Sequence, residues 1–174
     1  MRAGPVRSLV IGIGNPLRGD DGIAWRLAAR LPAQAGLAVR CQHQLTPEMA
    51  ADLAAVDRLL VIDAWVGPGE RAPLQLQELA APGALSQAGA AAGPWAGAAP
   101  WGGASHGLSP QELLALSQAL FGHAPRAQQL LLPARCFGHG EGISPALARR
   151  LGEARGLIAG WIAAGSALQG GGHA

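Results

Sequence analysis

VIGIGNPLRGDDG, residues 10–22, joins an apolar run to the expected start of a helix. Such short, continuous apolar runs are typical of strands that are buried on both faces of a parallel sheet. The glycines and the asparagine that follow indicate a turn. Asp20 and Asp21 then stand where acidic side chains cap a helix or complement its dipole. Strand, turn and helix in this order predict the first unit of an α/β fold.

The rest of the chain repeats this alternation. Strands are expected at 8–14, 37–44, 58–64 and 128–134, the second nearer an edge because it alternates, and the last ending at its proline. A first helix is expected after the aspartates, and three more begin at a hydroxyl residue followed by proline, at Thr46, Ser109 and Ser144. We therefore predict an α/β fold with three layers, a doubly wound and mostly parallel sheet of about five strands flanked by helices.

Length and local composition predict one domain. The 174 residues fit a single α/β domain at 1–168, followed by a disordered tail at 169–174. Residues 80–104 consist almost wholly of Ala, Gly and Pro, so we expect a flexible loop there. This loop is either a tolerated surface insertion or a flap whose Trp95 and Trp101 touch a partner.

Charge and cysteine content exclude several classes of protein. The 13 basic residues are all arginines, scattered along a chain of net charge +2, which argues against a nucleic-acid surface. No apolar run approaches the roughly 20 residues of a membrane span. Cys41 and Cys136 form no CxxC motif and no disulfide scaffold. We expect a cytoplasmic protein that is a monomer when free.

The glycine turn does not match the phosphate-binding loops that it superficially resembles. A dinucleotide fingerprint requires a third glycine where Leu17 stands, and Pro16 has no amide hydrogen to offer a phosphate. A Walker-type loop requires a lysine, and the chain contains none. One aspartate of the pair is therefore expected to cap the helix while the other points into the crevice beyond the strand.

Two further side chains are expected near that crevice. Asp63 ends an apolar strand, and the carboxyl ends of strands are where open parallel sheets bind ligands. His106 stands just ahead of the helix that begins at Ser109, which predicts the same edge of the sheet. One imidazole and two carboxylates suit a transition-metal site with open positions. Another set of side chains, Cys136, His139 and Glu141, is either incidental to a turn or part of a substrate groove.

Three motifs, GIGNPLRGDDGIA, VIDA and SHGLSP, resemble in their order and separations the hydrogenase maturation proteases. These endopeptidases trim the C-terminal extension from the large subunit of nickel–iron hydrogenases. The likeness covers nearly the whole chain. HQLTPE (43–48) and GEGISP (140–145) are similar to the members that serve NAD-linked, bidirectional hydrogenases.

The resemblance implies a site and a substrate. Asp21, Asp63 and His106 would be both the catalytic residues and the contacts to nickel, which the precursor of the large subunit carries and the protease does not hold tightly itself. Asp20 would cap the helix or support a ligand. The protease would cut one peptide bond after a basic residue of that precursor. Ala24 departs from the family, which usually has a second glycine there, and the loop before His106 is longer than usual.

Two other functions remain open. A nickel-binding chaperone would use the same three ligands without cleaving a peptide. A peptidyl-tRNA hydrolase has a similar glycine-asparagine turn, but its continuation differs from Asp20 and Asp21, and it requires a basic face that this chain hardly offers.

Overall fold

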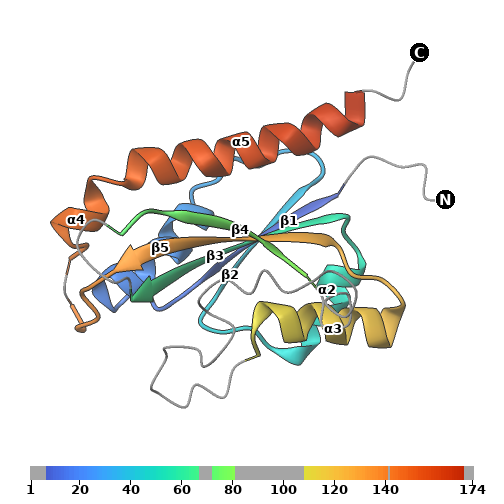
Figure 1. The fold of residues 1–174 in the computed structure, drawn as a ribbon, viewed down its shortest axis with the longest axis horizontal. Coiled ribbons are helices and arrows are strands. Elements are labelled where there is room, and N and C mark those ends of the chain that lie inside the picture. Colours follow the sequence, from blue (N-terminus) through green and yellow to red (C-terminus); the bar gives the residue numbers. More distant parts are fainter. Residues whose placement is uncertain (1–6, 67–71, 81–107, 141, 171–174) are drawn as a thin grey trace.

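The computed structural model describes residues 7–66, 72–80, 108–140 and 142–170 (Figure 1). Within them lies one five-stranded sheet in the order β2-β1-β3-β5-β4. Its strands are β1 (Ser8–Ile13), β2 (Leu37–Gln42), β3 (Arg58–Val66), β4 (Gln75–Leu79) and β5 (Arg126–Ala134). The helices are η1 (Gly19–Gly22), α1 (Ile23–Ala28), η2 (Pro47–Met49), α2 (Ala50–Ala54), α3 (Pro110–Phe121), α4 (Pro145–Ala148) and α5 (Leu151–Gly170).

The sheet is mostly parallel, which confirms the predicted fold class. β1 pairs in parallel with β2 and β3, and β3 pairs in parallel with β5. β4, which the sequence analysis did not predict, adds to the edge beside β5 in the antiparallel direction. β2 lies at the opposite edge, as its alternating pattern indicated.

Helices cover both faces of the sheet (Figure 1). Leu60 and Ile62 of β3 belong to the buried cluster that includes α1, α4 and α5. The alternate residues Leu59 and Val61 belong to the cluster that includes α2 and α3. A strand covered on both sides buries every residue whichever way its side chain points, which explains the continuous apolar run.

The three hydroxyl residues that precede a proline differ in whether their side chains cap the helix that follows. At α3 the Ser109 hydroxyl accepts a bond from the Glu112 amide at 3.2 Å, and the Glu112 carboxylate accepts one from the Ser109 amide at 2.7 Å. Ser144 caps α4 by accepting a bond from the Leu147 amide at 3.3 Å. Thr46 precedes η2 but makes no side-chain capping bond.

Several boundaries differ from the expectations, among them the end of β3, which continues past Asp63 to Val66. The predicted last helix divides into α4 and α5, and α5 continues to Gly170, so the first residues of the predicted tail are helical. β5 continues through Pro133 to Ala134, beyond the last residue that pairs with β4, where a missing amide hydrogen is tolerated. Residues 81–104 of the predicted loop and 171–174 of the predicted tail lie outside the described residues. No helix in the described part of the chain is long and apolar enough to cross a bilayer.

Replacing the capping hydroxyl of α3, in the variant Ser109→Ala, should lower the free energy of unfolding by about 1 kcal/mol. The reason is that the Glu112 amide loses its acceptor. Urea denaturation measures the change. Gln118→Ala, an exposed position of the same helix, is the control and should leave stability unchanged. Equal stability of both variants would show that the capping box contributes nothing.

Candidate functional site

The order of the strands creates a crevice between β1 and β3. The chain leaves β1 through α1 to β2 on one side, and it continues through α2 to β3 on the other. Open α/β sheets bind ligands at such a switch point, beyond the carboxyl ends of the two strands. The β1–β3 ladder ends at the pair Gly12 and Ile62, so Asp63 is the first residue of β3 beyond it. The strand order therefore places Asp63 at the crevice.

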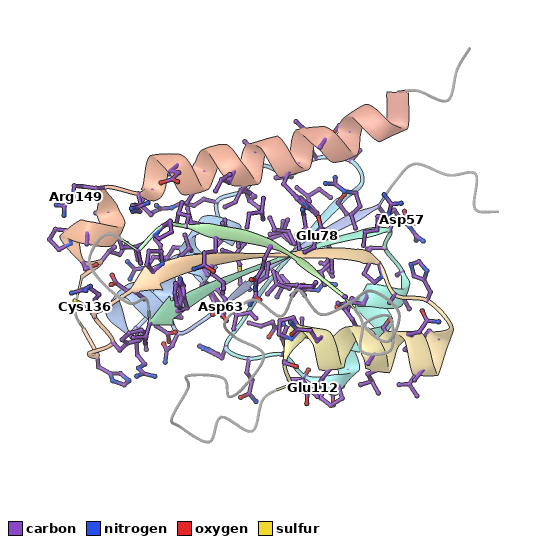
Figure 2. All side chains as sticks on the ribbon, in the orientation of Figure 1. Asp57, Asp63, Glu78, Glu112, Cys136 and Arg149 are labelled. Atoms are coloured by element: carbon purple, nitrogen blue, oxygen red, sulfur yellow. The ribbon has the colours of Figure 1, made fainter. Side chains whose placement is uncertain are left out.

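The carboxylate of Asp63 faces the side of the sheet covered by α2 and α3. Strand alternation puts it on the same face as Leu59 and Val61, and Glu112 near the start of α3 lies on that side as well (Figure 2). The Ala64 amide donates to one carboxylate oxygen at 2.8 Å. Burial raises the pKa of Asp63 from 3.8 to about 7, against the lowering effect of the Ala64 amide, and the negative charge of Asp21 adds to the rise. The two carboxylates thus lie close enough to interact.

Asp21 is held by the turn that follows β1. The Asn15 amide donates to its carboxylate at 3.0 Å, and the Asn15 side-chain oxygen accepts a bond from the Leu17 amide at 2.9 Å. Gly14 has a φ of 141°, and a side-chain carbon there would overlap the carbonyl oxygen of Asp21. Glycine is therefore required for the chain to fold back and place Asp21 beside the end of β1.

Asp20 caps neither η1 nor α1, so of its two expected roles the helix cap is wrong. Its fully buried carboxylate accepts bonds from the amides of Arg135 at 2.8 Å and Cys136 at 3.2 Å, and from the Ser144 amide at 2.6 Å. The Asp20 amide in turn donates to the Cys136 carbonyl at 2.8 Å. Gly19, with a φ of 44°, lets the two backbones approach, since a side-chain carbon there would lie 2.6 Å from that carbonyl oxygen. Asp20 thus fastens the turn before Asp21 to the segment between β5 and α4.

The same two segments meet at further points. The Arg18 guanidinium donates from Nε to the Phe137 carbonyl at 3.1 Å, and the Gly140 amide donates to the Leu17 carbonyl at 3.0 Å. The backbone of Cys136 therefore supports the Asp20 turn. Of the other two residues in its predicted set, His139 is exposed and Glu141 lies outside the described residues. In the part of the chain that the structure covers, no three His, Cys, Asp or Glu side chains are grouped to hold a metal.

His106 lies outside the described residues, and its place in the site stays a prediction. The structure does describe the helix that follows it. α3 lies on the opposite side of the sheet from α5, and it packs on the sheet face that Asp63 shares (Figure 1). Of the three predicted ligands, Asp21 and Asp63 are thus brought to one edge of the sheet.

One pair of rings near this edge was not predicted. The indole of Trp25 in α1 and the imidazole of His43, which follows β2, lie 5.1 Å apart between ring centres and are tilted by 38°. Arg26 donates from Nη2 to the Pro16 carbonyl at 2.9 Å and so braces the turn from α1. The hydropathy pattern carries no signal for these contacts, because they depend on how β2 and α1 flank β1.

The variant Asp20→Asn should lower the free energy of unfolding by about 1–3 kcal/mol. The NH₂ group of asparagine cannot accept a hydrogen bond, so at least one backbone amide that now donates to Asp20 would lose its acceptor. Urea denaturation compares it with Asp21→Asn, whose carboxylate accepts one backbone bond and which should change stability much less. Equal losses in the two variants would refute the fastening role of Asp20.

The raised pKa of Asp63 predicts a specific dependence on pH. Because the folded chain keeps this proton to a higher pH than the unfolded chain, wild-type stability should fall relative to Asp63→Asn between about pH 4 and pH 7. The ¹³C shift of the Asp63 carboxyl should titrate near 7, and at a lower pH in Asp21→Asn. A wild-type midpoint close to 4 would contradict both expectations.

Comparisons with known proteins bear on this arrangement. No family model and no curated protein matches the chain. Among solved structures, the chain is similar to the NiFe hydrogenase maturation protease HycI from Thermococcus kodakarensis KOD1, with a TM-score of 0.62, 21% identity, and coverage of 90% of this chain and 92% of that one. It is also similar to the hydrogenase maturating endopeptidase HybD from E. coli, with a TM-score of 0.59, 18% identity, and coverage of 88% and 90%. A hydrogenase 2 maturation peptidase from a Thaumarchaeota archaeon matches with a TM-score of 0.57 and 18% identity over 90% and 97%. This chain therefore has the fold of the hydrogenase maturation proteases.

Proposed function

We propose that this protein is an endopeptidase that removes the C-terminal extension from the nickel-loaded precursor of a hydrogenase large subunit. Asp21, Asp63 and His106 are the proposed contacts to the nickel that the precursor carries. The placement of Asp21 by the turn after β1 and of Asp63 just beyond the β1–β3 ladder carries the proposal. The similarity in fold to solved maturation proteases supports it.

The two carboxylates are available to a ligand in a way that Asp20 is not. An ionised carboxylate has about four lone-pair positions for hydrogen bonds or metals. Among the described residues, Asp21 accepts one backbone bond and Asp63 another, so both retain free positions. Carboxylate and imidazole are suitable ligands for divalent transition metals, nickel included. A metal ion at a peptide bond polarises the carbonyl or activates water, so substrate-borne nickel would make cleavage conditional on metal loading.

Exposed apolar side chains around this edge suit a protein substrate. Leu17, in the turn after β1, is 69% exposed, and Val66, at the end of β3, is 56% exposed. Both residues belong to the segments that carry Asp21 and Asp63. An exposed apolar side chain on each of these segments offers contact area that another chain can bury. We propose that the C-terminal segment of the precursor lies over them during cleavage.

The proposal extends to the subtype of substrate. The motifs HQLTPE and GEGISP support an NAD-linked hydrogenase as the source of the precursor. Their residues flank the site, since His43 stacks on Trp25 beside the turn and Ser144 donates to Asp20. Precursors of NAD-linked and of other hydrogenases, offered to the protein in parallel, would distinguish the subtype from the general function.

The decisive experiment incubates the protein with nickel-loaded and nickel-free precursor and follows the mass of the precursor by mass spectrometry. Only the loaded form should become shorter. Asp21→Asn and His106→Ala should each abolish shortening, while their melting temperatures stay within a few degrees of wild type, because neither is expected to support the core.

Each alternative has its own result in this experiment. Stable binding of the loaded precursor without shortening would replace the protease by a nickel-binding chaperone. Shortening at the wild-type rate in either variant would remove that residue from the site. Arg126→Ala is the matched control, because this exposed residue begins β5, at the end of the parallel strands opposite the crevice, and its shortening rate should equal that of wild type.

A further inference from the structure

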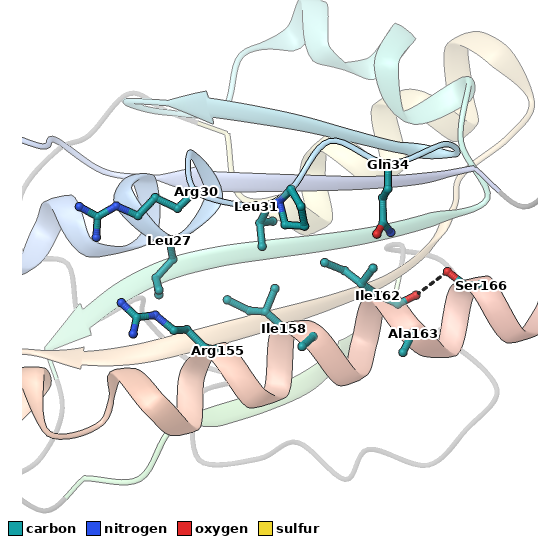
Figure 3. Close-up of a pocket in the computed structure, with 11 residues that line it drawn as sticks. Leu27, Arg30, Leu31, Gln34, Arg155, Ile158, Ile162, Ala163 and Ser166 are labelled. Carbon is teal, nitrogen blue, oxygen red and sulfur yellow. Dashed lines mark hydrogen bonds between the residues drawn. The ribbon is translucent and has the colours of Figure 1, made fainter.

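A groove separates α1 and α5 on one face of the sheet (Figure 3). Its volume is about 490 Å³, and residues 27–34 line one wall while α5 lines the other from Arg155 to Ser166. At about 1.5 Å per residue, this stretch of α5 is roughly 16 Å long. The floor is apolar: Leu27 and Ile158 are buried, and Leu31 and Ile162 are half-buried. The α1–α5 groove thus leaves part of the core covered by nothing among the described residues.

Charge at the groove is of one sign. Arg30 and Arg155 line it and are exposed, and neither guanidinium group forms an ion pair or hydrogen bond in the described part of the chain. Their guanidinium groups lie at the end of the groove toward which the parallel strands point (Figure 3). None of the described residues that line the groove is acidic. An aliphatic floor with two unpaired cations at one end complements a ligand that is apolar along its length and anionic at one point.

We propose that the α1–α5 groove docks a segment of a partner protein that carries aliphatic side chains and one carboxylate, with the carboxylate held between Arg30 and Arg155. The inference rests on the proposed function, in which that partner is the hydrogenase precursor. The groove lies on the face of the sheet that Asp63 does not share, since its floor residues belong to the opposite buried cluster. Docking there adds affinity for the folded precursor without touching the peptide that is cut.

A second copy of this chain does not complement the groove. A two-fold contact places the same surface on both sides. Among the described residues, the lining of this surface would then offer no carboxylate to the arginines of the other copy. α5 also presents two small exposed side chains to the groove, Ala159 and Ala163. Small side chains leave room for a helix or an extended chain to lie against α5.

The kinetic test uses the charge-reversal variant Arg30→Glu/Arg155→Glu with nickel-loaded precursor. We expect KM to rise at least tenfold while kcat stays within twofold, because the variant removes binding and leaves the cleavage site intact. Arg7→Glu/Arg126→Glu carries the same change in charge at the opposite edge of the sheet and should cleave as wild type does. A double variant of the groove with an unchanged KM would overturn the docking site even if cleavage itself is confirmed.

A second measurement does not depend on cleavage. A photo-crosslinking p-benzoylphenylalanine at Ala163 should label the precursor on a segment that contains an aspartate or glutamate within about one helical turn of the crosslink. The same probe at Gln118 on α3 is the control and should not label it. Labelling of a second copy of this chain, or no labelling at position 163, would overturn the proposal. Absence of shortening by the wild-type protein would instead defeat the proposed function, and the crosslink would still report on docking.

Discussion

The buried carboxylate of Asp20 is the interaction on which the site depends. A carboxylate loses its hydration when it is buried, and it is stable there only if hydrogen-bond donors replace the water. Three backbone amides do so, from Arg135, Cys136 and Ser144. They belong to the segment between β5 and α4, whereas Asp20 belongs to the turn after β1. One side chain thus fixes two distant segments, and the position of Asp21 follows from that of its neighbour.

Features that depend on local interactions could be predicted from the sequence. β1, β3 and β5 are covered on both faces, so their apolar runs are continuous and unmistakable. The capping box at Ser109 is a contact between residues three apart, and it forms as the spacing indicates. Asp63 could be placed at a ligand-binding edge from the general topology of parallel sheets, although β3 continues past it to Val66 and only the ladder with β1 ends at Ile62.

Features that depend on distant contacts could not be predicted. β4 has the sequence QLQEL at the edge of the sheet and lacks the apolar run that identified the other strands. Its place beside β5 is decided by pairing with a strand far along the chain. The role of Asp20 stayed open between a helix cap and support of a ligand for the same reason, because its acceptor contacts reach residues 115 to 124 positions away.

The adjacent aspartates show how the same residue type acquires opposite roles. The carboxylate of Asp20 is fully buried and accepts three backbone bonds, which leaves it little capacity for a ligand. Asp21 faces the crevice, accepts one bond and interacts with the charge of Asp63. Repulsion between two partly desolvated carboxylates is unfavourable unless a proton or a cation lies between them. The turn that Asp20 holds in place keeps Asp21 from moving away, so the repulsion contributes to the raised pKa of Asp63. Under the proposed function, a cation carried by the precursor would relieve the same repulsion.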